Sequence, residues 1–238
     1  MSEGREEQAR YYDELFSKFE YANSLQLMRA ASIFDALVKT GLTGPRILDF
    51  GCGSGWLTNI LAMFGPTVGV ELSPHAVETA TRRFPAAKFE ASDVFKWQHP
   101  AGSFDVVVSQ EVLEHVDEQA LYLQLAANFL RDKGFLILTT PNKYTMMAMP
   151  EQQRTGWSNQ PLENWLTPGE VRTLLQKNFE NVHLDTIIFG MGSSGSYRAV
   201  NSAKLLRLFE GIRLDKSYNW TRGRLGYGLH TVATARKR

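Results

Sequence analysis

The sequence has one cysteine, almost no net charge and no long apolar run, and each shortage excludes a class of protein. With Cys52 alone, no disulfide can form within the chain, which agrees with a reducing compartment. No apolar run reaches the roughly 20 residues that a membrane-spanning helix needs. The N-terminal stretch MSEGREEQAR is too polar for a signal peptide. These absences predict a cytoplasmic protein with no membrane span.

The small net charge of +1 hides an uneven distribution. Residues 197–238 contain ten Lys or Arg and only two acidic residues, Glu210 and Asp215, so this segment is +8 and the rest is −7. Such an imbalance suits an acidic substrate, a phosphate or a nucleic acid, but a solvated basic surface explains it as well. With 43% apolar and 21% charged residues, the composition is that of an ordinary globular protein.

Apolar periods and turn residues predict a helical N-terminus followed by alternating strands and helices. Residues 6–38 have apolar side chains at helical spacing, and Gly41, Gly44 and Pro45 end this pattern. Apolar strands that alternate with helices indicate a parallel sheet covered on both faces, which is a doubly wound α/β fold. The strands are expected at 46–50, 67–72, 88–92, 104–109, 135–140, 181–189 and 229–236, and the later helices at 56–64, 74–84, 118–134, 168–179 and 200–212.

The run ILDFGCGSGWL joins a predicted strand to a predicted helix through Gly51, Gly53 and Gly55. Glycines let a ligand approach the backbone, and the N-terminus of the next helix offers unpaired N–H groups. A dinucleotide fingerprint would need glycine in place of Trp56, and a phosphate-binding loop would need Lys followed by Ser or Thr. Asp49 would repel a pyrophosphate. The turn therefore favours a ligand with a cationic or zwitterionic end.

Two further carboxylates stand at the ends of the next two predicted strands. Glu71 follows Gly51 by twenty positions, at the end of VGVEL, where a carboxylate can accept both hydroxyls of a ribose. Asp93 comes after the third strand, in SDVF, where it can accept from an exocyclic amine. Together with Asp49, these residues suit an adenosine that carries an amino acid.

Five motifs in order resemble those of the class I S-adenosylmethionine-dependent methyltransferases. They are ILDFGCGSG, VELS, SDVF, FDVVVSQEVLEHV and FLRDKGFLILTTPN, and they cover about residues 45–142. The likeness is greatest to the small-molecule branch that includes ubiquinone-biosynthesis O-methyltransferases. The resemblance implies S-adenosyl-L-methionine as cofactor and a Rossmann-like, mostly parallel seven-stranded sheet whose last strand is antiparallel. It also implies an N-terminal helical lid over residues 1–40 and a methyltransferase domain over 41–238.

The resemblance assigns the methionine end of the cofactor to the glycine turn and the strand beside it. Gly51, Gly53 and Gly55 would pack under the methionine part. Asp49 would lie near its ammonium group, directly or through water. Gln110, just past the fourth strand, would also touch the methionine part. In the alternative interpretation, the glycines bind no ligand and serve only the tight turn between strand and helix.

The adenosine end would be held by the next strand ends. Glu71 would accept the ribose hydroxyls, and Leu72 would lie beside the adenine. Asp93 would accept from the adenine amine, and Val94 would offer its backbone N–H. Tyr12 would contact the cofactor from the lid. Without the glycine turn, Glu71 or Asp93 would be interpreted as a solvated carboxylate at the end of a strand.

His115 is the best candidate for a general base, because it follows the fourth strand and its ordinary pKa lies near neutrality. A structural histidine that braces the loop is an equally good interpretation. No metal site is predicted. The segments 142–166 and 190–225 are predicted as insertions on the substrate side, since loops of this length are often functional.

Aromatic and methionine side chains of the first insertion predict an adaptable apolar wall for an aromatic or alkyl substrate, although a small local core would look the same. Arg154 and Arg198 could then hold a carboxylate or phosphate of that substrate. The predicted substrate-binding residues are Tyr144, Met147, Arg154, Trp157 and Trp165.

The sequence predicts a cytoplasmic methyltransferase that acts on a small molecule, with O-transfer favoured over N- or C-transfer. The stretch Ser109-Gln110-Glu111-Val112 lacks the motif of the DNA amino-methyltransferases, and nucleic acid is not the expected partner. An RNA methyltransferase, an NAD-dependent oxidoreductase and a non-catalytic S-adenosylmethionine-binding module remain as alternatives. The acceptor and the oligomeric state are left open.

Overall fold

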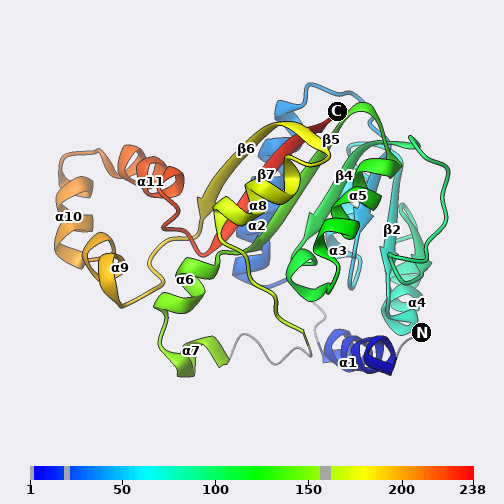
Figure 1. Cartoon of the computed structure of the whole chain (residues 1–238), viewed down its shortest axis with the longest axis horizontal. Coiled ribbons are helices and arrows are strands. Elements are labelled where there is room, and N and C mark those ends of the chain that lie inside the picture. Colours follow the sequence, from blue (N-terminus) through cyan, green and yellow to red (C-terminus); the bar gives the residue numbers. More distant parts are fainter. Residues whose placement is uncertain (1–2, 19–21, 156–161) are drawn as a thin grey trace.

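The computed structural model describes residues 3–18, 22–155 and 162–238, and a seven-stranded sheet forms their core (Figure 1). The strand order is β3-β2-β1-β4-β5-β7-β6. β7 runs antiparallel to β5 and β6, and the other neighbours are parallel. The predicted fold class is thereby confirmed. The strands are β1 Ile47–Phe50, β2 Thr67–Glu71, β3 Lys88–Ala91, β4 Phe104–Gln110, β5 Leu130–Pro141, β6 Phe179–Ile187 and β7 His230–Lys237.

The helices of the described residues cover both faces of this sheet (Figure 1). Within those residues, every helix is too short or too polar to cross a lipid bilayer. The helices are α1 Glu3–Lys18, α2 Ser24–Lys39, α3 Trp56–Leu61, α4 Pro74–Arg83, the 3-10 turn η1 Leu113–His115, α5 Gln119–Phe129, α6 Lys143–Ala148, α7 Glu151–Thr155, α8 Pro168–Leu175, α9 Gly195–Val200, α10 Ala203–Gly211 and α11 Asp215–Arg224.

Successive residues of the central strands pack into two separate apolar layers. In β1, Ile47 joins the cluster that contains Ile33 of α2 and Leu61 of α3. Its neighbour Leu48 faces the other way and packs in the cluster that contains Leu123 of α5. Because side chains alternate between the faces of a strand and both faces are covered, apolar residues of these strands are buried on both sides of the sheet.

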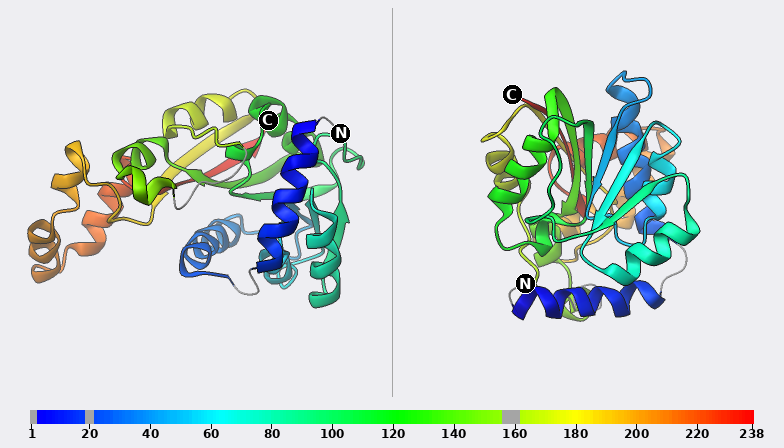
Figure 2. Two further views of the ribbon diagram at one scale, coloured as in Figure 1. Left: turned by 90° about the horizontal axis from the view of Figure 1, so that it is seen from below. Right: turned by 90° about the vertical axis from the view of Figure 1, so that its right-hand side faces the viewer.

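The helical pattern predicted over 6–38 corresponds to two helices in the described residues, α1 and α2. α2 begins at a capping box, in which Asn23 accepts from the N–H of Gln26 and the Gln26 side chain accepts from the N–H of Asn23. α2 packs on the sheet through buried Ile33 and Leu37, so it belongs to the core. α1 lies across one end of the sheet (Figure 2). The boundary of a lid at residue 40 stays a prediction.

Two other helix predictions differ from the structure. The helix expected over 118–134 ends at Phe129, because β5 begins at Leu130 and pairs there with Phe104 of β4. The helix expected over 200–212 is present as the shorter α10, whereas α9 and α11 on either side of it were not predicted, and the three helices project beyond β6 (Figure 1). The sequence of α11 has no clear apolar stripe, and therefore gave no helical signal.

Gly55 is required by packing as well as by its backbone conformation. Its φ is +76°, and a Cβ built there would lie 2.7 Å from Cβ of Ala80 and 2.7 Å from Cε1 of Phe89. Gly41 also has a positive φ, of +71°, but nothing lies within 4 Å of its Cβ position. Substitutions at these two glycines therefore distinguish the cost of a left-handed backbone, which both share, from the cost of a steric clash, which only Gly55 has.

We expect Gly55→Ala to lower the free energy of unfolding more than Gly41→Ala does. Each variant loses about 1–2 kcal/mol through its left-handed backbone, and Gly55→Ala loses about 1–3 kcal/mol more through overpacking. Urea denaturation of both variants and the parent measures the difference. Equal losses would show that the close contacts at Gly55 relax without cost.

Candidate functional site

A cavity of about 600 Å³ lies at the carboxyl ends of β1, β2 and β4, with α1 forming part of its wall. This volume is within the range of about 300–1,000 Å³ that is usual for small-molecule sites. The cavity brings together most of the residues predicted from the sequence. Those that line it are Tyr12, Asp49, Gly51, Gly53, Glu71, Leu72, Asp93, Val94, Gln110, His115 and Trp165.

The glycine turn presents its backbone to this cavity. Gly51 has a φ of +93°, and a Cβ built there would lie 2.4 Å from Cγ2 of Val112. The backbone N–H groups of Gly51 and Cys52 both donate to the carbonyl oxygen of Val70, at 2.9 and 3.0 Å. These bonds fix the turn to β2. Gly55 does not line the cavity and instead packs against α4 and β3.

Asp49 at the end of β1 is a buried carboxyl group, with 1% of its surface exposed. Its Oδ2 accepts from the Thr58 hydroxyl at 2.6 Å. Burial raises the pKa of Asp49 to about 7, although the hydrogen bond from Thr58 lowers it and the charge of Glu71 raises it further. A cationic ligand group beside Asp49 would favour the ionised form, because opposite charges stabilise each other in a buried site.

Glu71 at the end of β2 is held by two backbone N–H groups. Gly53 donates to Oε2 and Ser73 donates to Oε1, each at 3.0 Å. Burial raises the pKa of Glu71, while these hydrogen bonds lower it. A carboxylate has about four lone-pair positions, so Glu71 can still accept from two ligand hydroxyls.

The wall beyond β3 carries the second half of the predicted adenosine site. Asp93 is buried, and its Oδ1 accepts from the backbone N–H of Phe95 at 3.0 Å. Leu72 and Val94 line the same part of the cavity. A carboxylate beside apolar side chains suits a flat ring with an exocyclic amine.

Gln110 tests whether the cavity fits the methionine end of the expected cofactor. Its Nε2 is buried and has no hydrogen-bond partner among the described residues. An unsatisfied buried donor costs about 1–3 kcal/mol. Gln110 lines the cavity together with Asp49 and Gly53. An amino-acid carboxylate would satisfy this donor, so these residues fit the group.

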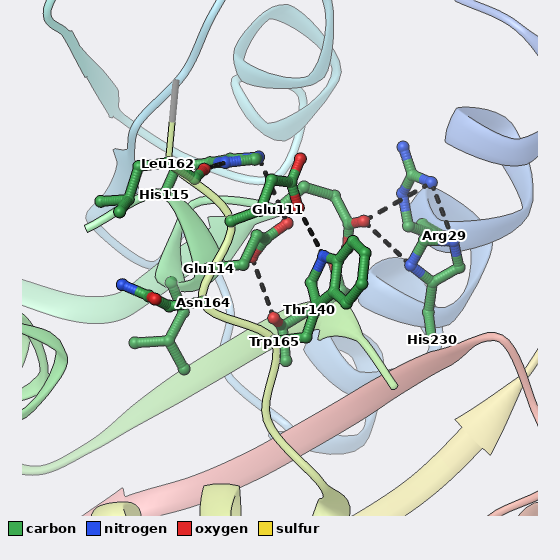
Figure 3. A network of polar contacts seen from close by, with 12 residues as sticks. Arg29, Glu111, Glu114, His115, Thr140, Leu162, Asn164, Trp165 and His230 are labelled. Atoms are coloured by element: carbon green, nitrogen blue, oxygen red, sulfur yellow. Dashed lines mark hydrogen bonds and ion pairs between the residues drawn. The ribbon is translucent and has the colours of Figure 1, made fainter. Parts of the chain in front are cut away.

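A charged network closes the cavity on the side of α2 and β7 (Figure 3). Oε2 of Glu111 lies 2.9 Å from Nδ1 of His230 and 3.7 Å from Nη1 of Arg29. Nη1 of Arg29 lies 3.2 Å from Nε2 of His230. Since arginine can only donate, Nε2 of His230 accepts and its Nδ1 faces Glu111 with a proton. Although burial raises the pKa of Glu111, Arg29 and His230 lower it to about 2.

His115 lies next to this network and lines the cavity (Figure 3). Its Nδ1 donates to the carbonyl oxygen of Leu162 at 2.8 Å, which leaves Nε2 without a proton in the neutral ring. Nε2 is 3.6 Å from Oε1 of Glu114. Burial lowers the pKa of His115, although its bond to Leu162 raises it. His115 is therefore held in one tautomer, with a basic nitrogen available.

Two glutamates beside His115 were not predicted from the sequence. Glu114 is 1% exposed and accepts from the Thr140 hydroxyl at 2.9 Å. Burial and then the charge of Glu111 raise the pKa of Glu114 well above its ordinary value. Glu163 accepts from Nε1 of Trp165, and burial raises the pKa of Glu163 to about 7.

Most of the predicted substrate-binding residues are not at the cavity. Tyr144 and Met147 are each 60% exposed on α6, and neither lines it. Arg154 contacts the Met147 sulfur at 3.7 Å instead of the cavity. Trp157 lies outside the described residues. Among the described residues of the segment 142–166, the cavity is lined by Met146, Glu163 and Trp165.

The sequence offered a signal for some of the unpredicted residues. Glu111 and Glu114 stand in the same motif as His115, and their closeness to a candidate base in the sequence is a signal for a place at the same site. Arg29 and His230 are 201 positions apart, so no local pattern joins them. Among the described residues, no group of three His, Cys, Asp or Glu is arranged to hold a metal ion.

The family model described as "Methyltransferase domain" matches residues 21–184. The chain belongs to this family. The methyltransferase is 27% identical over 197 residues to the mitochondrial ubiquinone biosynthesis O-methyltransferase of Mus musculus, covering 71% of this chain and 52% of that protein. It is 31% identical over 159 residues to the ubiquinone biosynthesis O-methyltransferase of Caulobacter sp., covering 61% of this chain and 63% of that protein. The methyltransferase thus spans about half of the mouse relative.

Solved structures show the same fold. The N-methyltransferase NodS from Bradyrhizobium japonicum, in complex with S-adenosyl-L-homocysteine, has a TM-score of 0.65 at 16% identity, covering 97% of this chain and 98% of that chain. The resemblance to class I S-adenosylmethionine-dependent methyltransferases is confirmed, and S-adenosyl-L-methionine is the cofactor of this family. The individual contacts predicted for the cofactor stay predictions.

We expect Asp49→Asn to stabilise the free methyltransferase and to weaken its binding of S-adenosylmethionine. Because the pKa of Asp49 is raised from 3.8 to about 7, the folded protein loses stability as pH rises between those values. Asparagine removes this cost, which is at most about 4 kcal/mol at pH 8. Loss of a charged hydrogen bond lowers the affinity by about 10–100-fold.

Thermal unfolding at pH 5 and pH 8, together with calorimetric titration of the cofactor, measures both effects of Asp49→Asn. The stabilisation should be larger at pH 8. Asp35→Asn is the matched control, because Asp35 is exposed on α2 and pairs with Lys39 at 2.6 Å. A stability gain that does not depend on pH would contradict the buried carboxylate as its cause.

Proposed function

We propose that the methyltransferase transfers a methyl group to a hydroxyl oxygen of a small molecule bound beside His115. The observation that carries this proposal is the unprotonated Nε2 of His115 in the wall of the same cavity that holds the donor residues. The names of the mouse and Caulobacter relatives, both O-methyltransferases, support it. A site of about 600 Å³ has the size usual for small-molecule ligands, which suits a cofactor with a small acceptor.

The donor side of the cavity binds and orients the cofactor. S-adenosyl-L-methionine, when bound, supplies an electrophilic methyl group and leaves as S-adenosyl-L-homocysteine. In this proposal Asp49 and Gln110 hold its amino-acid end, and Glu71 and Asp93 hold its adenosine. Tyr12 lines the same cavity from α1, and burial and then the charge of Glu71 raise the pKa of its phenol. Fixing the reactants in this way lowers the activation barrier by roughly 7–11 kcal/mol.

His115 moves the proton of the acceptor hydroxyl. A hydroxyl is a weak nucleophile until its proton is lost, and Nε2 of His115 is positioned to take that proton. The hydrogen bond from Nδ1 to Leu162 holds the ring in place during the transfer. Because burial lowers the pKa of His115, the ring stays neutral and basic at neutral pH.

The basic C-terminal segment gives no support to a nucleic-acid substrate. Arg29 is the only lysine or arginine among the described residues that line the cavity, and it lies in α2. Arg198 is exposed on α9, away from this wall. A nucleic-acid methyltransferase would need cations beside its target to neutralise phosphates.

Transfer of labelled methyl groups tests the proposed function. We expect the methyltransferase to label a small hydroxylated compound in a metabolite extract when S-adenosylmethionine carries an isotopic methyl group. Glu71→Ala should lose both cofactor affinity and labelling, because it removes the acceptor for the ribose hydroxyls. Tight cofactor binding without transfer to any compound would indicate a binding module. Label that appears only in RNA would contradict the proposal.

We expect His115→Ala to keep cofactor affinity but to lower kcat by about 10²–10⁴-fold. In the parent, kcat should fall as pH decreases below the ordinary histidine value of 6.5, and this limb should vanish in the variant. His75→Ala is the control, because His75 is exposed on α4 and away from the cavity. An unchanged kcat in His115→Ala would remove the base from the mechanism.

A further inference from the structure

The wall of the cavity around His115 has more carboxylates than cations. Glu111, Glu114 and Glu163 all line it, and Arg29 is the one lysine or arginine in the described lining. The guanidinium of Arg29 is 3.7 Å from Glu111, so its charge is already balanced. Glu114 and Glu163 are left with no lysine or arginine partner within the described part of the chain.

Two hydrogen bonds join the segment that contains Glu163 to the segment that contains Glu114 and His115. The carbonyl oxygen of Leu162 accepts from Nδ1 of His115 at 2.8 Å. The backbone N–H of Asn164 donates to the carbonyl oxygen of Glu114 at 2.7 Å. Glu163 stands between Leu162 and Asn164 in the chain, so these two hydrogen bonds fix its backbone beside Glu114 and His115.

Aromatic side chains border the two carboxylates. Nε1 of Trp165 donates to Glu163 and holds that carboxylate beside the indole. Tyr12 lines the same cavity as both glutamates, and its pKa is raised by burial and, to a smaller extent, by the charges of Glu71, Glu114 and Glu163. Carboxylates next to aromatic rings form a favourable environment for an organic cation, through charge and through the negative faces of the rings.

We propose that this wall binds a protonated amine, placed between Glu114 and Glu163 against Trp165, and that the acceptor is therefore a hydroxylated amine. The inference rests on the proposed function, since it names the substrate class of the same site. The ammonium group supplies the missing positive charge, and the hydroxyl lies toward Nε2 of His115. The acidic substrate expected from Arg154 and Arg198 does not fit, because neither residue lines the cavity.

The geometry also distinguishes an amine from a bare metal ion. The described carboxylates and histidines do not converge on one point as metal ligands. Glu111 is engaged with Arg29 and His230, which removes it from such a set. An ammonium group has donors that point in several directions, so it can bond to two separated carboxylates. A carboxylate ligand in the same place would face like charges and be repelled.

A series of three phenols that differ in one group tests the amine. The methyltransferase is first saturated with S-adenosyl-L-homocysteine and then titrated calorimetrically with tyramine, tyrosol or 4-hydroxyphenylacetate. These ligands share the hydroxyphenyl ring and carry an ammonium, a neutral hydroxyl or a carboxylate. We expect tyramine to bind about tenfold or more tightly than tyrosol, and the acid to bind weakest.

Two variants and a control assign the preference to the wall. Glu163→Gln and Glu114→Gln should each lower the affinity for tyramine by about tenfold, while the affinity for the acid stays equal or rises. Glu78→Gln is the control, because Glu78 is exposed on α4 and outside the cavity. Thermal unfolding of each variant with S-adenosyl-L-homocysteine confirms that the fold and the donor site are intact.

The outcomes separate this inference from the proposed function. If S-adenosyl-L-homocysteine does not bind, the proposed function fails, and the amine site fails with it. If it binds but tyramine does not bind, or binds no better than the acid, the amine site alone is overturned. A tyramine preference that survives both glutamate variants also overturns it, because the cation would then be recognised elsewhere.

Discussion

A buried carboxylate needs either a proton or a nearby cation, and this requirement governs the whole functional end of the molecule. Six carboxylates line one cavity, namely Asp49, Glu71, Asp93, Glu111, Glu114 and Glu163. The described lining contains one guanidinium, that of Arg29, and it stabilises the ionised form of Glu111. The pKa values of Asp49, Glu71, Glu114 and Glu163 are all raised, and burial is the main cause for each. A cationic group beside any of these four carboxyl groups would favour its ionised form.

The fold explains why these groups meet although they are distant in the sequence. Parallel strands bring their carboxyl ends to one edge, so the residues that end β1, β2 and β4 become neighbours. The strand bodies must be apolar, because helices cover both faces, and polar side chains are confined to the ends. The left-handed backbone at Gly51 then turns the chain toward α3 and leaves room for a ligand. The same constraints that stabilise the core thus place the carboxylates around the cavity.

Local signals predicted the core of the fold and the donor side of the cavity. Asp49 is the penultimate residue of β1, Glu71 is the last residue of β2, and Asp93 comes two residues after β3, so topology alone places them together. The acceptor side depends on contacts that no local pattern encodes. His230 meets Arg29 only because antiparallel β7 pairs with β5 beside α2. Met147 and Tyr144 were predicted at the site from residue type, but the short helix α6 turns them to solvent, while buried Met146 faces inward.

The lysine and arginine residues of the basic C-terminal segment, 197–238, lie away from the cavity that the carboxylates line. Several of its cations bond to the chain itself: Arg236 donates to the carbonyl oxygen of Lys133 at 3.1 Å, and Lys237 donates to that of Leu130 at 2.6 Å. Arg222 is 5% exposed and lies 4.5 Å from the ring centre of Phe189, where it holds α11 against the end of β6. These cations join β7 to the beginning of β5 and stabilise the helical insertion. Because these cations bond elsewhere and none of them lines the cavity, the near-neutral net charge of the chain does not reflect the excess of carboxylates in the described cavity lining.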